Sequence, residues 1–167
     1  MKGIIISIEG TDGAGKHTQQ QLLKTKLKEL GHNVFDQCFP NYDSDSSAPV
    51  KMYLSGEFGG SNSLDAYQAS SLYAVDRLCT YKKTIEPHYE NGEIILFDRY
   101  VQSNFIHQCS KLDDPDDKLE FIAWEEDFEY NQSNENTKIH VRYDNWGNFV
   151  CMMGVVYHGE TQQISIG

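Results

Sequence analysis

Short apolar runs alternate with amphipathic stretches along most of this chain. Gly3–Glu9 and Glu93–Phe97 are apolar nearly throughout, which predicts strands that are buried on both faces of a sheet. Val34–Phe39 is predicted to be another strand, closed by Pro40. Lys16–Leu30 and Asp65–Tyr89 lie between them and have the spacing of helices. Strand and helix therefore alternate, and this order predicts an α/β domain built on a parallel sheet.

The helices are expected to present one apolar face each to the sheet or to one another. In the first helix Leu23, Leu27 and Leu30 recur at spacings of four and three. In the second, the inward positions are expected to be the apolar ones: Leu72, Val75, Leu78 and Cys79. Three more helical stretches are predicted, at Met52–Leu54, Gln102–Ser110 and Asp116–Tyr130.

The pattern changes after Tyr130. Lys138–Tyr143 alternates between apolar and polar positions, and Phe149–Tyr157 and Gln162–Ile166 are strand-like. Antiparallel strands, as a hairpin or a small meander, are expected here. The sequence thus predicts a core at residues 1–130 and a different, β-rich C-terminal extension at residues 131–167.

Composition and charge narrow the classes of partner. The 167 residues are 39% hydrophobic, which is enough for a core, and the formal net charge of -11 disfavours a nucleic-acid partner. No apolar run is long enough to span a membrane, and no signal peptide is apparent. The four scattered cysteines favour free thiols in a reducing cytoplasm over disulfides or a zinc site.

A glycine-rich segment follows the first strand. Gly10-Thr-Asp-Gly-Ala-Gly-Lys16 matches the first seven positions of the phosphate-binding P-loop, G-x-x-x-x-G-K-[ST], between a buried strand and a helix. Backbone N–H groups and the helix N-terminus bind phosphate oxygens in such a loop, and Lys16 adds a mobile positive charge. We expect a three-layer P-loop NTPase-type fold that binds ATP through one continuous segment: Gly10, Thr11, Asp12, Gly13, Ala14, Gly15, Lys16, His17 and Thr18.

Two positions bear on a magnesium ion. His17 replaces the Ser or Thr that would place a hydroxyl on Mg²⁺, and imidazole is a poor ligand for this cation. Either water holds more of the metal, or Thr18 compensates, or affinity for Mg-ATP is reduced. Asp98 ends the third strand, where a carboxylate beside a P-loop can hold Mg²⁺; the alternative is an aspartate that caps the next helix.

Four segments together resemble the thymidylate kinase family. They fall in the family's order and spacing, and the resemblance spans roughly residues 1–130: Glu9-Gly-Thr-Asp-Gly-Ala-Gly-Lys-His-Thr-Gln19, Phe39-Pro40, Ala74-Val-Asp-Arg77 and Asp98-Arg-Tyr-Val-Gln-Ser-Asn104. The P-loop alone would indicate only a broad superfamily. With Arg77 and the Asp98-Arg99-Tyr100 segment, the resemblance is much more specific.

The resemblance implies roles for individual residues. Arg99 would bind the 5′-phosphate of the acceptor, Arg77 would donate to the thymine carbonyl, and Tyr73 would stack on the base. Asp12 would approach the sugar 3′-hydroxyl and the metal, so that Asp12 and Asp98 are the expected metal ligands and Lys16, Arg99 and Asp12 the catalytic residues. Four further residues are expected to line the nucleoside pocket: Phe39, Ser103, Asn104 and Gln108.

Several of these residues could instead have a purely structural or surface role, without contact to a ligand. Arg99 would otherwise form a surface ion pair, and Tyr73 could equally be a core residue. Ser103, Asn104 and Gln108 would otherwise be solvated polar residues on a helix. His107 is assigned no chemistry.

The implied reaction is transfer of the ATP γ-phosphoryl group to dTMP, giving dTDP and ADP, in a cytoplasmic homodimer with Mg²⁺ as cofactor. The family places a catalytic arginine in the P-loop or in a mobile lid. The P-loop position here is Gly13, and Asn131–Gly167 holds one arginine, Arg142, without a recognisable lid. A frameshifted or recombined tail, a real alternative ending, and an arginine supplied by a partner chain all remain open.

Two other functions therefore stay in competition. One is a catalytically silent nucleotide-binding protein whose β-rich end is an interaction surface, as the absent lid suggests. The other is a kinase of another nucleoside or nucleotide. Arg77 and the Asp98-Arg99-Tyr100 segment favour dTMP over this last alternative.

Overall fold

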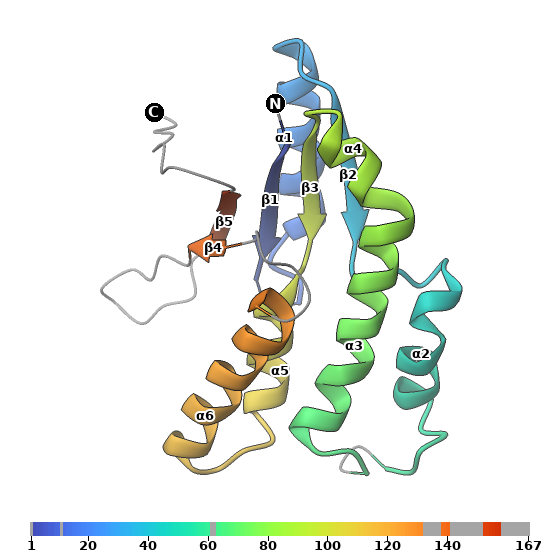
Figure 1. Cartoon of the computed structure of the whole chain (residues 1–167), viewed down its shortest axis with the longest axis vertical. Coiled ribbons are helices and arrows are strands. Elements are labelled where there is room, and N and C mark those ends of the chain that lie inside the picture. Colours follow the sequence, from blue (N-terminus) through green and yellow to red (C-terminus); the bar gives the residue numbers. More distant parts are fainter. Residues whose placement is uncertain (1, 11, 61–62, 132–137, 141–151, 158–167) are drawn as a thin grey trace.

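A twisted sheet flanked by helices forms the centre of the molecule (Figure 1). The computed structural model describes residues 2–10, 12–60, 63–131, 138–140 and 152–157. Within this part the sheet has five strands in the order β2-β3-β1-β5-β4. Its parallel half consists of β1 (Ile4–Glu9), β2 (Val34–Cys38) and β3 (Ile94–Asp98).

Of the three parallel strands, β3 has an unbroken apolar sequence up to Asp98, and β1 and β2 pair with it on either side. Ile5 of β1 and Phe35 of β2 both lie opposite Ile95 of β3, and all residues of β3 are buried. Strands of this kind need cover on both faces of the sheet. The predicted α/β architecture with a parallel sheet flanked by helices is confirmed.

The other half of the sheet comes from the C-terminal region. β5 (Met152–Tyr157) pairs antiparallel with β1, and β4 (Lys138–His140) pairs antiparallel with β5. The predicted strand at Gln162–Ile166 and the arginine at position 142 lie outside the described residues.

Helices cover the parallel strands from two sides (Figure 1). On one face, α1 (Lys16–Glu29) packs on the strands, and Gln20 of this helix donates to the backbone of β3. On the other face lie the π-helical turn η2 (Tyr81–Ile85) and α4 (Glu86–Glu90). A core cluster joins them to the sheet: Ile5, Phe39, Ile85, Tyr89, Ile95 and Phe97.

A second group of helices extends beyond the carboxyl ends of the parallel strands (Figure 1). It contains α2 (Ala48–Leu54), preceded by the short turn η1 (Asp45–Ser47), and α3 (Ala66–Thr80), which continues through η2 into α4. It also contains α5 (Val101–Cys109) and α6 (Pro115–Glu126), the latter extended by the π-helical turn η3 (Asp127–Asn131). In open α/β sheets this carboxyl edge is where ligands bind.

The start of α3 is fixed by a capping box. The Asp65 side chain accepts from the Gln68 backbone N–H, and the Gln68 side chain accepts from the Asp65 backbone N–H. This arrangement satisfies two backbone donors that would otherwise be unpaired. The helix therefore begins at Ala66, one residue after the start that the sequence predicts.

The predicted apolar face of α3 was wrong. Val75 and Leu78 are 47% and 41% exposed, Cys79 is exposed, and Leu72 is only half-buried. The buried positions are instead small or polar: Ala69, Ser70, Ala74, Asp76, Arg77 and Thr80. The reason is that α3 packs against α5 and α6 on one side and against the η1 segment on the other, and small side chains and polar networks fill both contacts.

Two smaller expectations can also be compared with the structure. Leu30, assigned to the apolar face of the first helix, is 64% exposed because α1 ends at Glu29. Among the described cysteines, Cys38, Cys79 and Cys109 are free thiols. No helix in the described ranges is long and apolar enough to cross a membrane.

Candidate functional site

A cavity of about 1060 Å³ opens at the carboxyl end of β3, among α2, α3 and α5. Its lining includes all the residues predicted to contact an acceptor nucleotide: Phe39, Tyr73, Arg77, Arg99, Ser103, Asn104 and Gln108. Asp12 of the glycine-rich loop lines the same cavity. Residues from distant parts of the sequence therefore meet in one space beside the loop.

The glycine-rich loop has the backbone conformation that its glycines allow. Gly13 and Gly15 both have φ 80°, in the left-handed region that disfavours side chains, and a Cβ at either position would meet no atom within 4 Å. Gly15 is also the N-cap of α1, which has no side-chain capping bond and no acidic residue in its first turn. This helix end is therefore open to an external anion.

Lys16 lies along the loop rather than in solvent. It is only 7% exposed, and its side chain passes Gly10 closely enough for a Cβ there to meet the lysine Cγ at 3.5 Å. Ala14, His17 and Thr18 are exposed, and Thr11 lies outside the described residues. The loop and the lysine have the arrangement expected for a phosphate cradle.

Asp98 lies next to this cradle at the end of β3. Its residue is 9% exposed, and its buried Oδ1 has no hydrogen-bond partner among the described residues. Its Oδ2 lies 3.9 Å from Nδ1 of the exposed His17. The N-cap of α5 is Tyr100, without a side-chain cap, so Asp98 does not serve as the capping residue of that helix.

Arg99 extends from β3 toward the loop. Its φ of 69° is the one positive value among the described non-glycine residues. Its guanidinium forms an ion pair with Asp12, where the side chains are 25% and 79% exposed respectively. The hydrogen bond and charge of Arg99 hold the pKa of Asp12 below its ordinary value.

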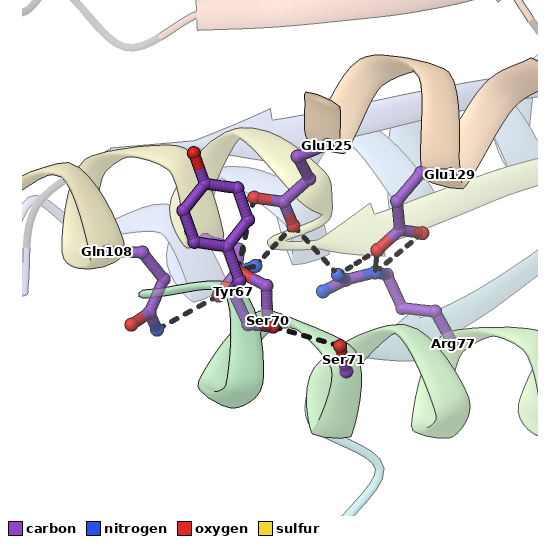
Figure 2. A network of polar contacts seen from close by, with 8 residues as sticks. Tyr67, Ser70, Ser71, Arg77, Gln108, Glu125 and Glu129 are labelled. Atoms are coloured by element: carbon purple, nitrogen blue, oxygen red, sulfur yellow. Dashed lines mark hydrogen bonds and ion pairs between the residues drawn. The ribbon is translucent and has the colours of Figure 1, made fainter. Parts of the chain in front are cut away.

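Arg77 forms a buried cluster with two glutamates from the end of α6 and from η3 (Figure 2). Its Nε donates to Glu129 at 3.0 Å and 3.2 Å, and its Nη2 pairs with Glu129 and lies 3.6 Å from Glu125 Oε1. The side chains of Arg77 and Glu125 are 4% and 0% exposed. Burial raises the pKa of Glu125 to about 7 even though the Arg77 charge opposes this shift.

Ser103, Asn104 and Gln108 of α5 are buried and hydrogen-bonded rather than solvated. Ser103 Oγ donates to Glu9, a buried carboxylate that also accepts from Ser7 at 2.7 Å and whose pKa is raised by burial. Asn104 Nδ2 donates to Ser70 Oγ at 2.9 Å and to Glu125. These contacts determine which donor and acceptor atoms are still available to hydrogen-bond a ligand in the cavity.

Aromatic and basic residues close the other side of the cavity. Tyr73 packs edge-on against Tyr53 with ring centroids 6.5 Å apart, and burial raises the pKa of its phenol to about 12. Lys111 donates to Tyr53 Oη at 2.8 Å and to the Leu64 carbonyl at 3.3 Å. His107, which was assigned no chemistry, also lines the cavity.

Four residues of the site and its surroundings were not expected from the sequence: Tyr53, Lys111, Glu125 and Glu129. The two glutamates are four residues apart and follow Phe121 at the same spacing, so all three share one helical face. Phe121 is fully buried. This spacing from a large aromatic residue was the signal that the two carboxylates point inward.

Comparisons with known proteins agree on one family. The sequence model described as "Thymidylate kinase" matches residues 8–116. The thymidylate kinase of Bifidobacterium longum (strain DJO10A) is 33% identical over 109 residues, covering 65% of this chain and 53% of that protein. That of Mycobacterium tuberculosis (strain CDC 1551 / Oshkosh) is 33% identical over 110 residues, covering 65% and 50%.

A solved structure of the same family is also similar to this chain. It is thymidylate kinase from Candida albicans, with a TM-score of 0.56 and 28% sequence identity. The match covers 71% of this chain and 49% of that one. The chain thus spans about half the length of the relatives that it matches.

Proposed function

The chain belongs to the thymidylate kinase family, and we propose that it transfers the γ-phosphoryl group of ATP to dTMP, giving dTDP and ADP. This proposal depends on one observation, which is that a single cavity is lined by both Arg99 and Arg77. The cavity begins at Arg99, whose guanidinium contacts the glycine-rich loop through Asp12, and it also reaches the buried Arg77. An acceptor nucleotide lying in it would have its phosphate at Arg99 and its base toward Arg77.

The donor phosphates would bind at the glycine-rich loop. The backbone N–H groups of Gly13 to Lys16, the open end of α1 and the Lys16 ammonium would together supply the positive charge that binds them. Phosphoryl transfer asks little covalent chemistry of a protein, so alignment and charge neutralisation are its main contributions.

Magnesium fits the residues beside this loop. The buried Asp98 Oδ1 has no protein partner among the described residues, and Asp12 is an exposed carboxylate on the loop itself. Mg²⁺ commonly takes one or two carboxylates and completes its shell with phosphates and water. When bound, it would neutralise charge on the transferring phosphoryl group. His17 lies beside Asp98 and would stay outside the metal's first shell.

The acceptor would be held at both ends. Arg99 would bind its phosphate in bidentate fashion, taking the place now filled by the Asp12 carboxylate. This exchange would leave Asp12 available to the metal and to the sugar hydroxyl. Arg77 would donate to the base and Tyr73 would stack on it, while Phe39, Ser103, Asn104 and Gln108 enclose the nucleoside.

A second function has one specific observation in its favour. The sequence holds three arginines, and two of them, Arg77 and Arg99, already serve the acceptor cavity. The third, Arg142, lies outside the described residues, and Gly13 occupies the P-loop position of the family's other arginine. A nucleotide-binding protein that lacks turnover would fit this count, since such an arginine accelerates transfer by roughly 10³–10⁵.

Two measurements separate these functions. Calorimetric titration should show that both dTMP and Mg-ATP bind, and an assay coupled to ADP release should detect turnover that requires both. Binding of both nucleotides without ADP release would favour the silent nucleotide-binding protein. Absence of dTMP binding, with Mg-ATP still bound, would refute the acceptor assignment and favour a kinase of another substrate.

We also propose which ligands the enzyme binds, its oligomeric state and its location. Small-molecule nucleotides would be its ligands, and it would act as a homodimer in the cytoplasm. Val75 and Leu78, three residues apart on α3, are exposed apolar residues that a second copy would cover in such a dimer. Light scattering would give the mass in solution.

A further inference from the structure

A single buried carboxylate oxygen contacts two residues that line the cavity. Glu125 Oε1 accepts from Asn104 Nδ2 and lies 3.6 Å from Arg77 Nη2 (Figure 2). Its other oxygen, Oε2, accepts from Ser70 Oγ at 3.3 Å. Glu125 itself is fully buried and does not line the cavity. Any influence that it has on a ligand must therefore pass through Asn104 and Arg77.

The contact with Glu125 sets the direction of the Asn104 amide. An ionised carboxylate only accepts hydrogen bonds, so Asn104 must present its Nδ2 to Glu125. Its Oδ1 then points the other way and accepts from Gln108 Nε2 at 3.2 Å. A carbonyl-type oxygen accepts two hydrogen bonds, and one acceptor site of Asn104 therefore remains for a ligand.

The same cluster sets the direction of the Arg77 guanidinium. Nε and Nη2 are directed to Glu129 and Glu125, and Nη1 has no hydrogen-bond partner among the described residues. Figure 2 shows this terminal nitrogen turned away from both carboxylates. Because Arg77 lines the cavity, Nη1 is the donor that it offers there. Glu125 thus orients the Asn104 acceptor directly, and its charge adds to the two Glu129 contacts that orient the Arg77 donor.

We propose that Glu125 is a specificity-determining positioning residue. It orients Asn104 Oδ1 and, together with Glu129, Arg77 Nη1, so that the cavity selects a base carrying an N–H donor beside a carbonyl acceptor. This inference rests on the proposed function and adds the residue that sets base choice. The 4-oxopyrimidine edge of thymine has this pattern. Cytosine has the reverse pattern, with an acceptor at N3 and a donor amino group, and would leave both protein groups unpaired.

The test compares Glu125→Gln with Glu126→Gln, measured at pH 8 so that Glu125 is ionised in the parent protein. Glu126 is the exposed neighbour on the same helix, so the control makes the same charge change outside the cluster. Calorimetry gives the Kd of dTMP, dCMP and Mg-ATP. The substituted amide can donate as well as accept, which frees Asn104 to turn over. We expect the preference for dTMP over dCMP to fall roughly 10- to 100-fold in Glu125→Gln, with Mg-ATP binding unchanged, and to stay unaltered in Glu126→Gln.

A role in packing alone would give a different result. Equal weakening of dTMP and dCMP, or an unchanged preference in a folded Glu125→Gln protein, would overturn the proposal. If the parent protein binds Mg-ATP but neither dTMP nor dCMP, it is the proposed function that fails. These outcomes are distinguishable because the preference ratio and the absolute affinity are measured separately.

A second measurement needs no substitution of Glu125. The side-chain amide protons of Asn104, assigned in ¹⁵N spectra by their loss in Asn104→Ala, should exchange slowly with water, because Ser70 Oγ and Glu125 accept them in a buried site. Rapid exchange of these protons would show that the amide is not held in this direction. That result would overturn the proposal even where Glu125→Gln does not fold.

Discussion

The two arginines of the cavity form ion pairs of opposite character. Arg99 pairs with Asp12 at the mouth, where the carboxylate is 79% exposed and belongs to the glycine-rich loop. Arg77 pairs with Glu125 and Glu129, all three nearly excluded from water. Water screens the first pair, so an incoming phosphate can replace its carboxylate at little cost. The second pair is desolvated, and neither partner can leave without exposing an uncompensated charge.

We infer that a ligand displaces Asp12 from Arg99, whereas Arg77 keeps its contacts with Glu125 and Glu129 when a ligand binds. An exchangeable arginine suits the phosphate, which must enter and leave in each catalytic cycle. A fixed arginine suits the base, whose recognition depends on the direction of a single donor. The four predictions below test this contrast, from the largest expected effect to the smallest.

Arg77→Ala should have the largest effect, on stability. It removes the cation from a buried cluster and leaves Glu125 and Glu129 facing each other, which costs about 3–5 kcal/mol in comparable buried pairs. Urea denaturation at pH 8 measures this loss. Arg99→Ala is the matched control and should change the unfolding free energy by less than about 1 kcal/mol. Equal losses of unfolding free energy in the two variants would show that the buried and exposed arginine pairs do not differ in their contribution to stability.

The pH dependence of stability should identify Glu125. Its pKa rises from 4.5 to about 7 on folding, so its contribution to stability is present below pH 4.5 and is lost as the pH rises through about 7. The unfolding free energy of the parent protein, measured relative to Glu125→Gln, should fall by up to about 3 kcal/mol between pH 4.5 and pH 8. Arg77 and Glu129 are present in both proteins. A difference that does not change with pH would contradict the assignment.

Arg99→Ala should act on the ligand instead. Loss of charged hydrogen bonds to the acceptor phosphate should weaken dTMP binding roughly 10- to 100-fold. Mg-ATP binding should stay within about twofold, because the guanidinium lies outside the phosphate cradle of the donor. Calorimetry measures both constants. Equal weakening of dTMP and Mg-ATP would place Arg99 in the donor site.

Asp12→Asn should have the smallest effect on the fold. It breaks the ion pair at the mouth of the cavity, but the carboxylate is exposed and its partner stays hydrated. The urea midpoint should therefore be unchanged at physiological salt. A clear drop in the midpoint would show that the Arg99 pair is structural after all, and that the two arginines do not differ in this respect.

The sequence predicted the parallel sheet and the glycine-rich loop because their signals are local. A β-branched run and a G-x-x-x-x-G-K spacing determine backbone conformation without help from distant residues. The buried face of α3 was not predictable in the same way. Its partners, α5 and α6, contribute polar side chains, and this overrides the rule that the apolar face points inward.

The cavity residues were recognised as a set through the family resemblance, and their individual roles remain predictions. The sequence alone gave no reason to pair Arg77 with Glu125 and Glu129. These glutamates stand in an acidic stretch, Glu125-Glu-Asp-Phe-Glu129, which has the composition of a solvated helix face. Only the tertiary contact between α3 and α6 turns two of its carboxylates into buried partners. The division into a core at 1–130 and an extension at 131–167 likewise stays a prediction.

The left-handed backbone at Arg99 limits how this position can evolve. A residue with a Cβ at φ 69° costs on the order of 1 kcal/mol, which glycine would relieve. Glycine, however, has no guanidinium to offer a phosphate. Selection for a more stable fold would therefore favour glycine at position 99, and selection for a tighter acceptor site would favour arginine. The arginine in this chain is the residue expected from selection for ligand binding.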